Sequence, residues 1–187
     1  MLTHKGTQII KIDNIVLRPF TMDDAEAMFK NWANDARVTQ YLTWEPHKDL
    51  EVTKAILSQW VEQYPSADYY QWAIDINSEA IGSMSVINIS DIHSRGAIGY
   101  CLGYEFWNKG IMTKTLKSVI DFMFAEVGIN KLYAFHDIRN LASGRVLEKC
   151  GMVEEGILRE EIRYSDGSYG DVRNLSILRK EWETART

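Results

Sequence analysis

Cysteine and proline are both scarce in this chain of 187 residues. The two cysteines, Cys101 and Cys150, are too few for a disulfide framework and form no Cys-x-x-Cys pair, so we expect two reduced packing residues. The three prolines are scattered rather than gathered in a linker. We therefore predict one domain over residues 1–187, with its core at about residues 15–182.

Long apolar runs and an excess of positive charge are missing as well. No stretch approaches the roughly 18 uninterrupted apolar residues of a transmembrane helix, and the start, MLTHKGTQIIKID, lacks the apolar centre of a signal peptide. We therefore expect a soluble, cytoplasmic protein without a membrane partner. The formal charge of −5 does not fit a general nucleic-acid binder and slightly favours a cationic substrate or a basic peptide.

Three motifs of nucleotide and metal chemistry are also absent. The chain contains no P-loop, no G-x-G-x-x-G and no H-E-x-x-H, and its histidines and cysteines do not cluster. The sequence therefore supports neither of those nucleotide sites nor a zinc site, and we expect no metal.

Hydrophobic periodicity predicts an α/β (α+β) chain. Strands are expected at Ile15–Phe20, Tyr69–Ile76, Ala80–Ile89, Gly96–Gly103, Lys131–His136, Met152–Tyr164 and Tyr169–Leu178. Helices are expected after Thr21, from about Asp49 to Tyr64, from Met112 to Glu126 and from Leu141 to Cys150. The three middle strands follow one another without helices, which excludes a simple doubly wound sheet. A mixed sheet of about seven strands with helices on both faces accounts for the order.

The most informative segment is Gly99–Thr115, GYCLGYEFWNKGIMTKT. A strand ends near Gly103, a loop carries Lys109 and Gly110, and a helix begins near Met112. The first turn of a helix has unpaired N–H groups and a partial positive charge, and a glycine lets an anion approach the backbone. This order is suited to a phosphate site, and the alternative is that Gly110 is a simple turn glycine.

The second informative segment is Asn140–Arg159, NLASGRVLEKCGMVEEGILR. On its own it indicates only a helix, a glycine stop and a strand, with Asn140 as a helix cap and Ser143 in the first turn. Taken together with Trp107-Asn108-Lys109-Gly110 and Leu17-Arg18-Pro19, its N-x-x-S and L-E-K-x-G pattern resembles the GNAT superfamily of acyl-CoA N-acyltransferases. Within that superfamily the sequence resembles the ribosomal-protein N-terminal acetyltransferase branch, over roughly Ile15–Trp182.

The resemblance implies a mostly antiparallel sheet that splays in the middle and takes acetyl-CoA as co-substrate. The opening would lie between the strand that ends near Leu102 and the strand Lys131–His136. The main chain of Tyr100, Cys101 and Leu102 would pair with the pantetheine arm, and Asn140 and Ser143 would reach the arm and the sulfur. The residues implied to hold the pyrophosphate are Trp107, Asn108, Lys109, Gly110, Ile111, Met112 and Thr113.

Three positions depart from the family pattern. Met112 stands where the family prefers a small residue, and we expect its side chain to turn into the core so that binding survives. Tyr133 or Phe135 occupies the neighbourhood of a glutamate that related enzymes often carry. Leu147 replaces their tyrosine acid. The assignment of the acid and the base therefore stays open.

The chemistry of amine acetylation favours an α-amine over a lysine. An α-amino group has a pKa near 7.7–8.0, whereas a lysine near 10.4 needs more help from a base. Glu105 is our first candidate for that base, and His136 and Asp137 follow. Ser143 is the candidate acid for the departing thiolate, and an N–H near Leu102 or Gly103 would stabilise the oxyanion.

For the acceptor side we expect a pocket that includes Tyr41, Trp44 and Trp72, with Glu45 and Asp49 able to attract a cation. The alternative for these aromatic side chains is packing in the core and against helices. The expected function is acetyl transfer to a protein or peptide N-terminus. A small amine, such as an aminoglycoside or a polyamine, is the alternative acceptor. A non-catalytic domain that binds acyl-CoA is the alternative of another class. The family likeness is also compatible with a homodimer.

Overall fold

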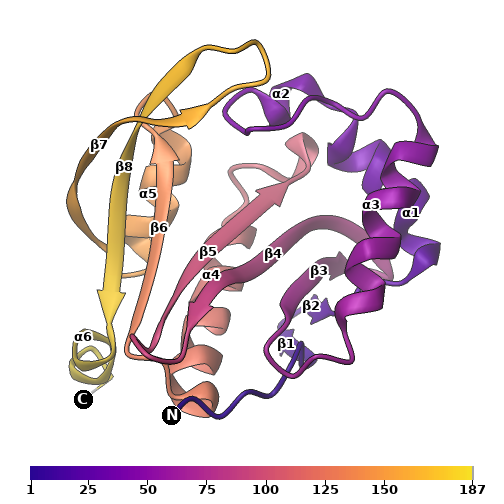
Figure 1. Ribbon diagram of the computed structural model, residues 1–187. Helices are drawn as coiled ribbons and strands as arrows, with labels where there is room; N and C mark the ends of the chain where they lie inside the picture. Colours follow the sequence, from indigo (N-terminus) through magenta and orange to yellow (C-terminus); the bar gives the residue numbers. More distant parts are fainter. Residues whose placement is uncertain (187) are drawn as a thin grey trace.

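The computed structural model describes residues 1–186 and contains one eight-stranded sheet in the order β1-β2-β3-β4-β5-β6-β8-β7 (Figure 1). The strands are β1 Ile10–Ile12, β2 Ile15–Arg18, β3 Tyr70–Ile76, β4 Glu79–Ser90, β5 Arg95–Leu102, β6 Lys131–Asp137, β7 Val153–Arg163 and β8 Tyr169–Leu178. All neighbouring strands are antiparallel except β5 and β6, which are parallel. The expected mixed, mostly antiparallel sheet is therefore confirmed.

Six α-helices accompany the sheet among the described residues. They are α1 Ala25–Met28, α2 Ala36–Thr39, α3 Leu50–Gln63, α4 Ile111–Phe122, α5 Leu141–Lys149 and α6 Arg179–Thr184. The α1 helix continues through a π turn at Phe29–Ala33, and α4 continues through another at Met123–Val127. No helix of residues 1–186 is long and apolar enough to cross a membrane.

The predicted strands and long helices all exist, and the differences lie in short elements. The strand at Ile15 ends at Arg18 because Pro19 has no N–H to donate to a ladder. The elements predicted from the sequence do not include β1, α2 and α6, which are three, four and six residues long. Elements this short do not complete enough periods for a hydrophobic pattern to reveal them.

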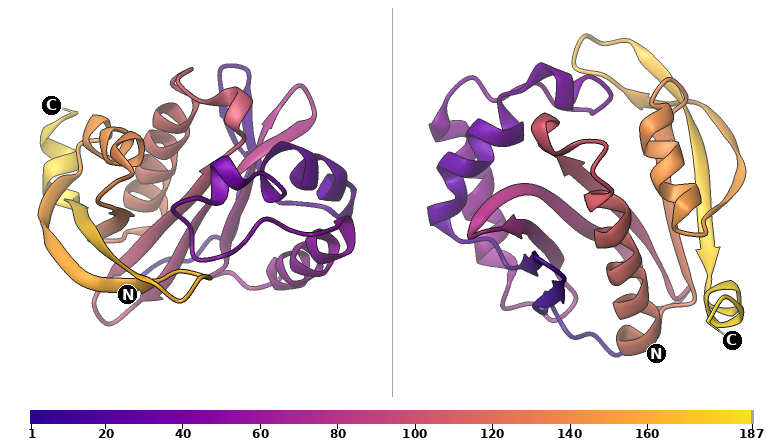
Figure 2. Two further views of the ribbon diagram at one scale, coloured as in Figure 1. Left: turned by 90° about the horizontal axis from the view of Figure 1, so that it is seen from above. Right: turned by 180° about the vertical axis from the view of Figure 1, so that it is seen from behind.

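Helices lie on both faces of the sheet, as expected (Figure 2), and a hydrophobic core lies beneath the helices of each face. Alternation along β3 divides its side chains, so that Trp72 and Ile74 join the core beneath α4 and α5, while Ala73 joins the core beneath α1 and α3. The first core includes Leu116 of α4 and Leu147 of α5, and the second includes Leu57 of α3. The β3–β4 part of the sheet is thus packed from both faces.

The sheet opens between β5 and β6. These strands pair only where Arg95–Ala97 runs beside Lys131–Tyr133, and beyond those residues they separate (Figure 1). On its other edge β6 stays paired with β8 as far as Asp137. The expected splay is confirmed, and it leaves one edge of β5 without a partner strand near its C-terminal end.

Candidate functional site

The N-terminus of α4 lies at the end of the loop that follows β5. Gly110 is its N-cap in the left-handed conformation, with φ +73°, and no side chain caps the helix. A Cβ built on Gly110 would meet no atom within 4 Å, so the space in front of the helix is open. Uncapped N–H groups, the positive end of the helix dipole and open space together suit an anion.

The side chains of the loop and first turn point away from this anion-binding position or brace the loop. Met112 is only 7% exposed and belongs to the core, which confirms the expected direction of its side chain. The Trp107 indole N–H donates to the Leu102 carbonyl at 2.7 Å, and the Lys109 ammonium lies 5.5 Å from the centre of the Phe106 ring. The loop is therefore tied to the strand that precedes it.

The free edge of β5 is made by alternate residues. Gly103 N–H donates to the Ile81 carbonyl at 2.8 Å, and Cys101 lies opposite Ser83 on β4. In an antiparallel strand the intervening residues direct their main chain to the other edge, so Tyr100 and Leu102 face the opening. Cys101 faces β4 instead, and Gly103 has no N–H left for an oxyanion, which leaves the N–H of Leu102 for that role.

Ser143 lies near the opening, in the first turn of α5. Its hydroxyl is 2.8 Å from the hydroxyl of Tyr100, and its N–H donates at 3.1 Å to the side-chain oxygen of Asn140, which caps the helix. Asn140 and Ser143 therefore lie next to Tyr100 on the free edge of β5. The amide NH₂ of Asn140 is left for a ligand, because capping uses only the oxygen.

The three candidate bases have different surroundings. Glu105 is exposed in the short 3-10 turn Tyr104–Phe106 after β5. His136 is buried, its Nδ1 hydrogen-bonds the Asp137 carbonyl at 2.7 Å, and its Nε2 faces Gly144, where a Cβ would come within 2.8 Å. This contact explains why α5 carries a glycine there, and it gives His136 a packing role.

Asp137, at the end of β6, is only 2% exposed. Its carboxylate accepts hydrogen bonds from the guanidinium and N–H of Arg139 and from the hydroxyl of Tyr164. Burial on its own raises the pKa of Asp137, but these hydrogen bonds outweigh it and lower the pKa to about 2. Asp137 is thus a fully engaged anion that ties β6 to the β7–β8 hairpin.

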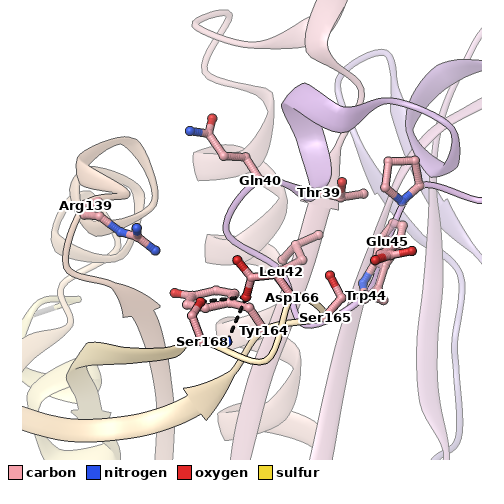
Figure 3. A pocket seen from close by; sticks show the side chains of 11 residues that line it. Thr39, Gln40, Leu42, Trp44, Glu45, Arg139, Tyr164, Ser165, Asp166 and Ser168 are labelled. Carbon is pink, nitrogen blue, oxygen red and sulfur yellow. Dashed lines mark hydrogen bonds between the residues drawn. The ribbon is translucent and has the colours of Figure 1, made fainter.

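A cavity of about 250 Å³ lies where this hairpin meets the segment after α2 (Figure 3). It is lined by Thr39, Gln40, Leu42, Trp44, Glu45, Pro46, Arg139, Tyr164, Ser165, Asp166 and Ser168. The Arg139 guanidinium lies 5.7 Å from the Tyr41 ring centre and 5.4 Å from that of Tyr164, so it bridges the two walls. Hydrogen bonds from Ser168 lower the pKa of Asp166, which keeps that carboxylate ionised.

The expected acceptor residues divide between this cavity and the core. Trp44 and Glu45 line the cavity. Tyr41 does not line it, but its ring lies near Arg139, which does. Trp72 does not: its side chain is 0% exposed, and its indole donates to the Gln8 carbonyl at 2.7 Å, so the expectation for Trp72 was wrong. Asp49 is the N-cap of α3, where its side chain accepts from Val52 N–H.

Sequence reasoning missed Arg139, Tyr164 and Asp166 as cavity residues. The dipeptide Asp166-Gly167 is typical of a tight hairpin turn, and Gly167 has φ +86°, but nothing in the sequence placed that turn opposite Trp44. Cys101 and Cys150 are free thiols, as expected. No group of three His, Cys, Asp or Glu side chains within residues 1–186 is arranged to hold a metal ion.

Comparison with known proteins identifies the family. Residues 14–153, most of the chain, match the family described as acetyltransferase (GNAT) domain. The chain belongs to the GNAT acetyltransferase family. This acetyltransferase is 30% identical over 173 residues to the Bacillus subtilis (strain 168) protein described as uncharacterized N-acetyltransferase YoaA, a match that covers 91% of this chain and 97% of that protein.

Two further relatives are named for different acceptors. The spermidine N(1)-acetyltransferase of Vibrio cholerae serotype O1 is 24% identical over 81% of this chain and 86% of its own. The crystal structure of ribosomal-protein-S5-alanine acetyltransferase from Vibrio fischeri matches with a TM-score of 0.76 at 25% identity, over 94% of this chain and 98% of its own. The GNAT acetyltransferase described here is thus an N-acetyltransferase related to enzymes with unlike amine substrates.

Proposed function

We propose that this GNAT acetyltransferase transfers the acetyl group of acetyl-CoA directly to the α-amine of a protein or peptide N-terminus. One observation supports the donor half above all: the uncapped start of α4 and the unpartnered edge of β5 adjoin one opening of the sheet. A diphosphate at the helix start and an extended arm beside the strand fit that pair of surfaces. The donor's acetyl thioester would then lie near Ser143.

Each step of the transfer has a residue in this proposal. The amine loses its proton to solvent or to Glu105, with a water as relay, and its nitrogen attacks the thioester carbon. The N–H of Leu102 stabilises the oxyanion. The carbon–sulfur bond then breaks, and Ser143 hydrogen-bonds the departing thiolate. Because a thiol has a pKa near 8.5, the thiolate leaves without full protonation.

The charges of the cavity favour a peptide over a polyamine. Glu45 and Asp166 can attract an ammonium group, but Arg139, whose Nε and Nη2 are paired with Asp137, presents the rest of its guanidinium to the same cavity. A peptide N-terminus carries one ammonium and offers carbonyl groups as acceptors for the guanidinium. A polyamine carries several cations, one of which would approach Arg139.

A polyamine remains the second candidate, because the Vibrio cholerae relative is named for spermidine. The two candidates predict opposite effects of Arg139→Gln. Removal of a repelling cation should raise kcat/KM for spermidine, whereas loss of a carbonyl-binding guanidinium should lower kcat/KM for a peptide.

The deciding experiment measures CoA release from acetyl-CoA with four acceptors: a short peptide, the same peptide with a blocked α-amine, a peptide whose only amine is a lysine, and spermidine. We expect release with the free α-amine alone, and mass spectrometry should find one added acetyl group on that amine. Release with spermidine alone would favour the second candidate. Binding of acetyl-CoA without release on any of these amines would contradict the proposed acceptor classes.

A further inference from the structure

Tyr100 carries a phenol that the proposed reaction does not use. The side chain leaves β5 toward α5 and packs against the larger core. Its hydroxyl lies 2.8 Å from the Ser143 hydroxyl and 3.3 Å from the Ser143 carbonyl. Burial raises the pKa of Tyr100, so the phenol stays protonated and able to donate throughout the neutral range.

Ser143 is held from two directions. The main-chain N–H of Ser143 donates to the side-chain oxygen of Asn140, which fixes the first turn of the helix. The hydroxyl of Tyr100 contacts the side chain of Ser143. Among residues 1–186 no other side chain hydrogen-bonds the Ser143 hydroxyl. The direction of the serine O–H therefore depends on Tyr100.

The surroundings of Ser143 on α5 offer no substitute for this phenol. Leu147 lies one turn further along the same face, and it is an apolar side chain that is fully buried. Tyr100 therefore reaches the serine across the fold, over a sequence separation of 43 residues. The main chain of the same tyrosine faces the opening, so one residue contributes both to the edge of β5 and to the contact with Ser143.

We propose that Tyr100 is the positioning residue for Ser143 in acetyl transfer. In this proposal the phenol gives its one proton to Ser143 Oγ at 2.8 Å and not to the more distant Ser143 carbonyl at 3.3 Å, which turns the single O–H of the serine toward the sulfur in the opening. When the carbon–sulfur bond breaks, its electron pair stays on sulfur, and the serine O–H hydrogen-bonds that charge. Tyr100 keeps its proton, and the proton of the amine goes to the base. This inference rests on the proposed function, because it assigns a role within that reaction.

The test compares the wild-type enzyme with Tyr100→Phe, Ser143→Ala and the double variant. Tyr100→Phe should lower kcat about tenfold, the order expected for one lost hydrogen bond, and leave the KM for acetyl-CoA within about twofold. Tyr69→Phe, in a half-buried ring whose hydroxyl makes no hydrogen bond among the described residues, is the matched control and should change neither constant. Thermal unfolding of all variants verifies that they fold.

The double variant separates positioning from packing. If Tyr100 acts through Ser143, its removal from the Ser143→Ala enzyme should cause no further loss of kcat. An unchanged kcat in Tyr100→Phe, or a tenfold further loss in the double variant, would overturn the inference. If Ser143→Ala has no measurable turnover, the separate kcat and KM of Tyr100→Phe decide. A wild-type enzyme that releases no CoA with any amine would instead refute the proposed function, and this role would fall with it.

Discussion

At the scale of single residues, several polar side chains near the opening and the cavity are fixed by partners from distant segments. Asp137 is bound by Tyr164, 27 residues further along the chain, in addition to its near neighbour Arg139, and Ser143 is bound by Tyr100 from β5. Glu105 is different, because it is exposed just after β5 and its carboxylate makes no hydrogen bond with the other described residues. A candidate base needs a carboxylate that is free to accept a proton, whereas a structural carboxylate such as Asp137 is held by hydrogen bonds.

Asp137→Asn should destabilise the protein by roughly 2 kcal/mol at neutral pH, as the lowered pKa implies. A depressed folded-state pKa stabilises above the ordinary value of 3.8, and that stabilisation is lost as pH falls toward about 2. The difference between wild type and variant should therefore shrink from pH 5 to pH 3, as followed by urea unfolding. Asp13→Asn, which loses only an exposed pair with Lys114, is the control and should cost little at any pH.

Glu105→Gln should lower kcat/KM near pH 7 and recover part of the loss at higher pH. The reason is that more of the acceptor's α-amine is neutral there without help, since its pKa is near 7.7–8.0. The measurement is the pH–rate curve of both enzymes. Glu51→Gln, an exposed residue of α3, should leave the curve unchanged. A Glu105→Gln curve identical to that of the wild type would remove Glu105 from the mechanism.

At the scale of elements, the loop from β5 to α4 concentrates unusual backbone geometry. Asn108 and Gly110 both have positive φ, at 59° and 73°, and the helix that follows has no side-chain cap. A helix start normally gains stability from a capping side chain. The lack of one here leaves the N–H groups available to an external anion, which is the functional reading of the loop.

Substitution at Gly110 tests that reading with two side chains of nearly equal shape. Asn and Asp both tolerate the left-handed region, and space is available for either. Gly110→Asp should weaken acetyl-CoA binding at least tenfold, because its charge faces the proposed diphosphate, while Gly110→Asn should weaken it much less. Calorimetric titration gives both dissociation constants. Equal affinities for the two variants would place the diphosphate elsewhere.

At the scale of the whole molecule, two cores hold one sheet that is opened between β5 and β6. The antiparallel pairs on either side of the opening keep their ladders, so the gap costs hydrogen bonds only along the facing edges of β5 and β6. Main-chain groups left unpaired in a sheet are a place for an extended ligand to bind. An extended ligand bound there would then continue the hydrogen-bonding pattern of the sheet.

Acetyl-CoA should therefore raise the melting temperature of the whole domain. At a ligand concentration of 100 times Kd the stabilisation is about 2.7 kcal/mol, or about 5–10 °C for a domain of this size. Differential scanning fluorimetry with increasing acetyl-CoA measures the shift. Gly110→Asp should show a smaller shift at the same concentrations. The absence of any shift in the wild-type protein would speak against the proposed co-substrate.

Local pattern accounts for much of this protein. The start of α3 follows from its cap Asp49 and its end from Pro65, the end of the π turn after α4 follows from Gly128, and the β7–β8 turn follows from Asp166-Gly167. These features depend on neighbours within a few residues, where backbone preferences and periodicity act directly. The loop that carries Gly110 and the helix that carries Ser143 were recognisable for the same reason.

What the tertiary structure alone decided are the contacts between distant segments. The sequence determined that Tyr100 lies on a strand and Ser143 on a helix, but only packing brought their hydroxyls together. Packing likewise buried Trp72 and set the β7–β8 turn against the segment after α2 to form the cavity. A pattern records which face of an element is apolar, whereas the partner of that face depends on how all the layers fill space at once.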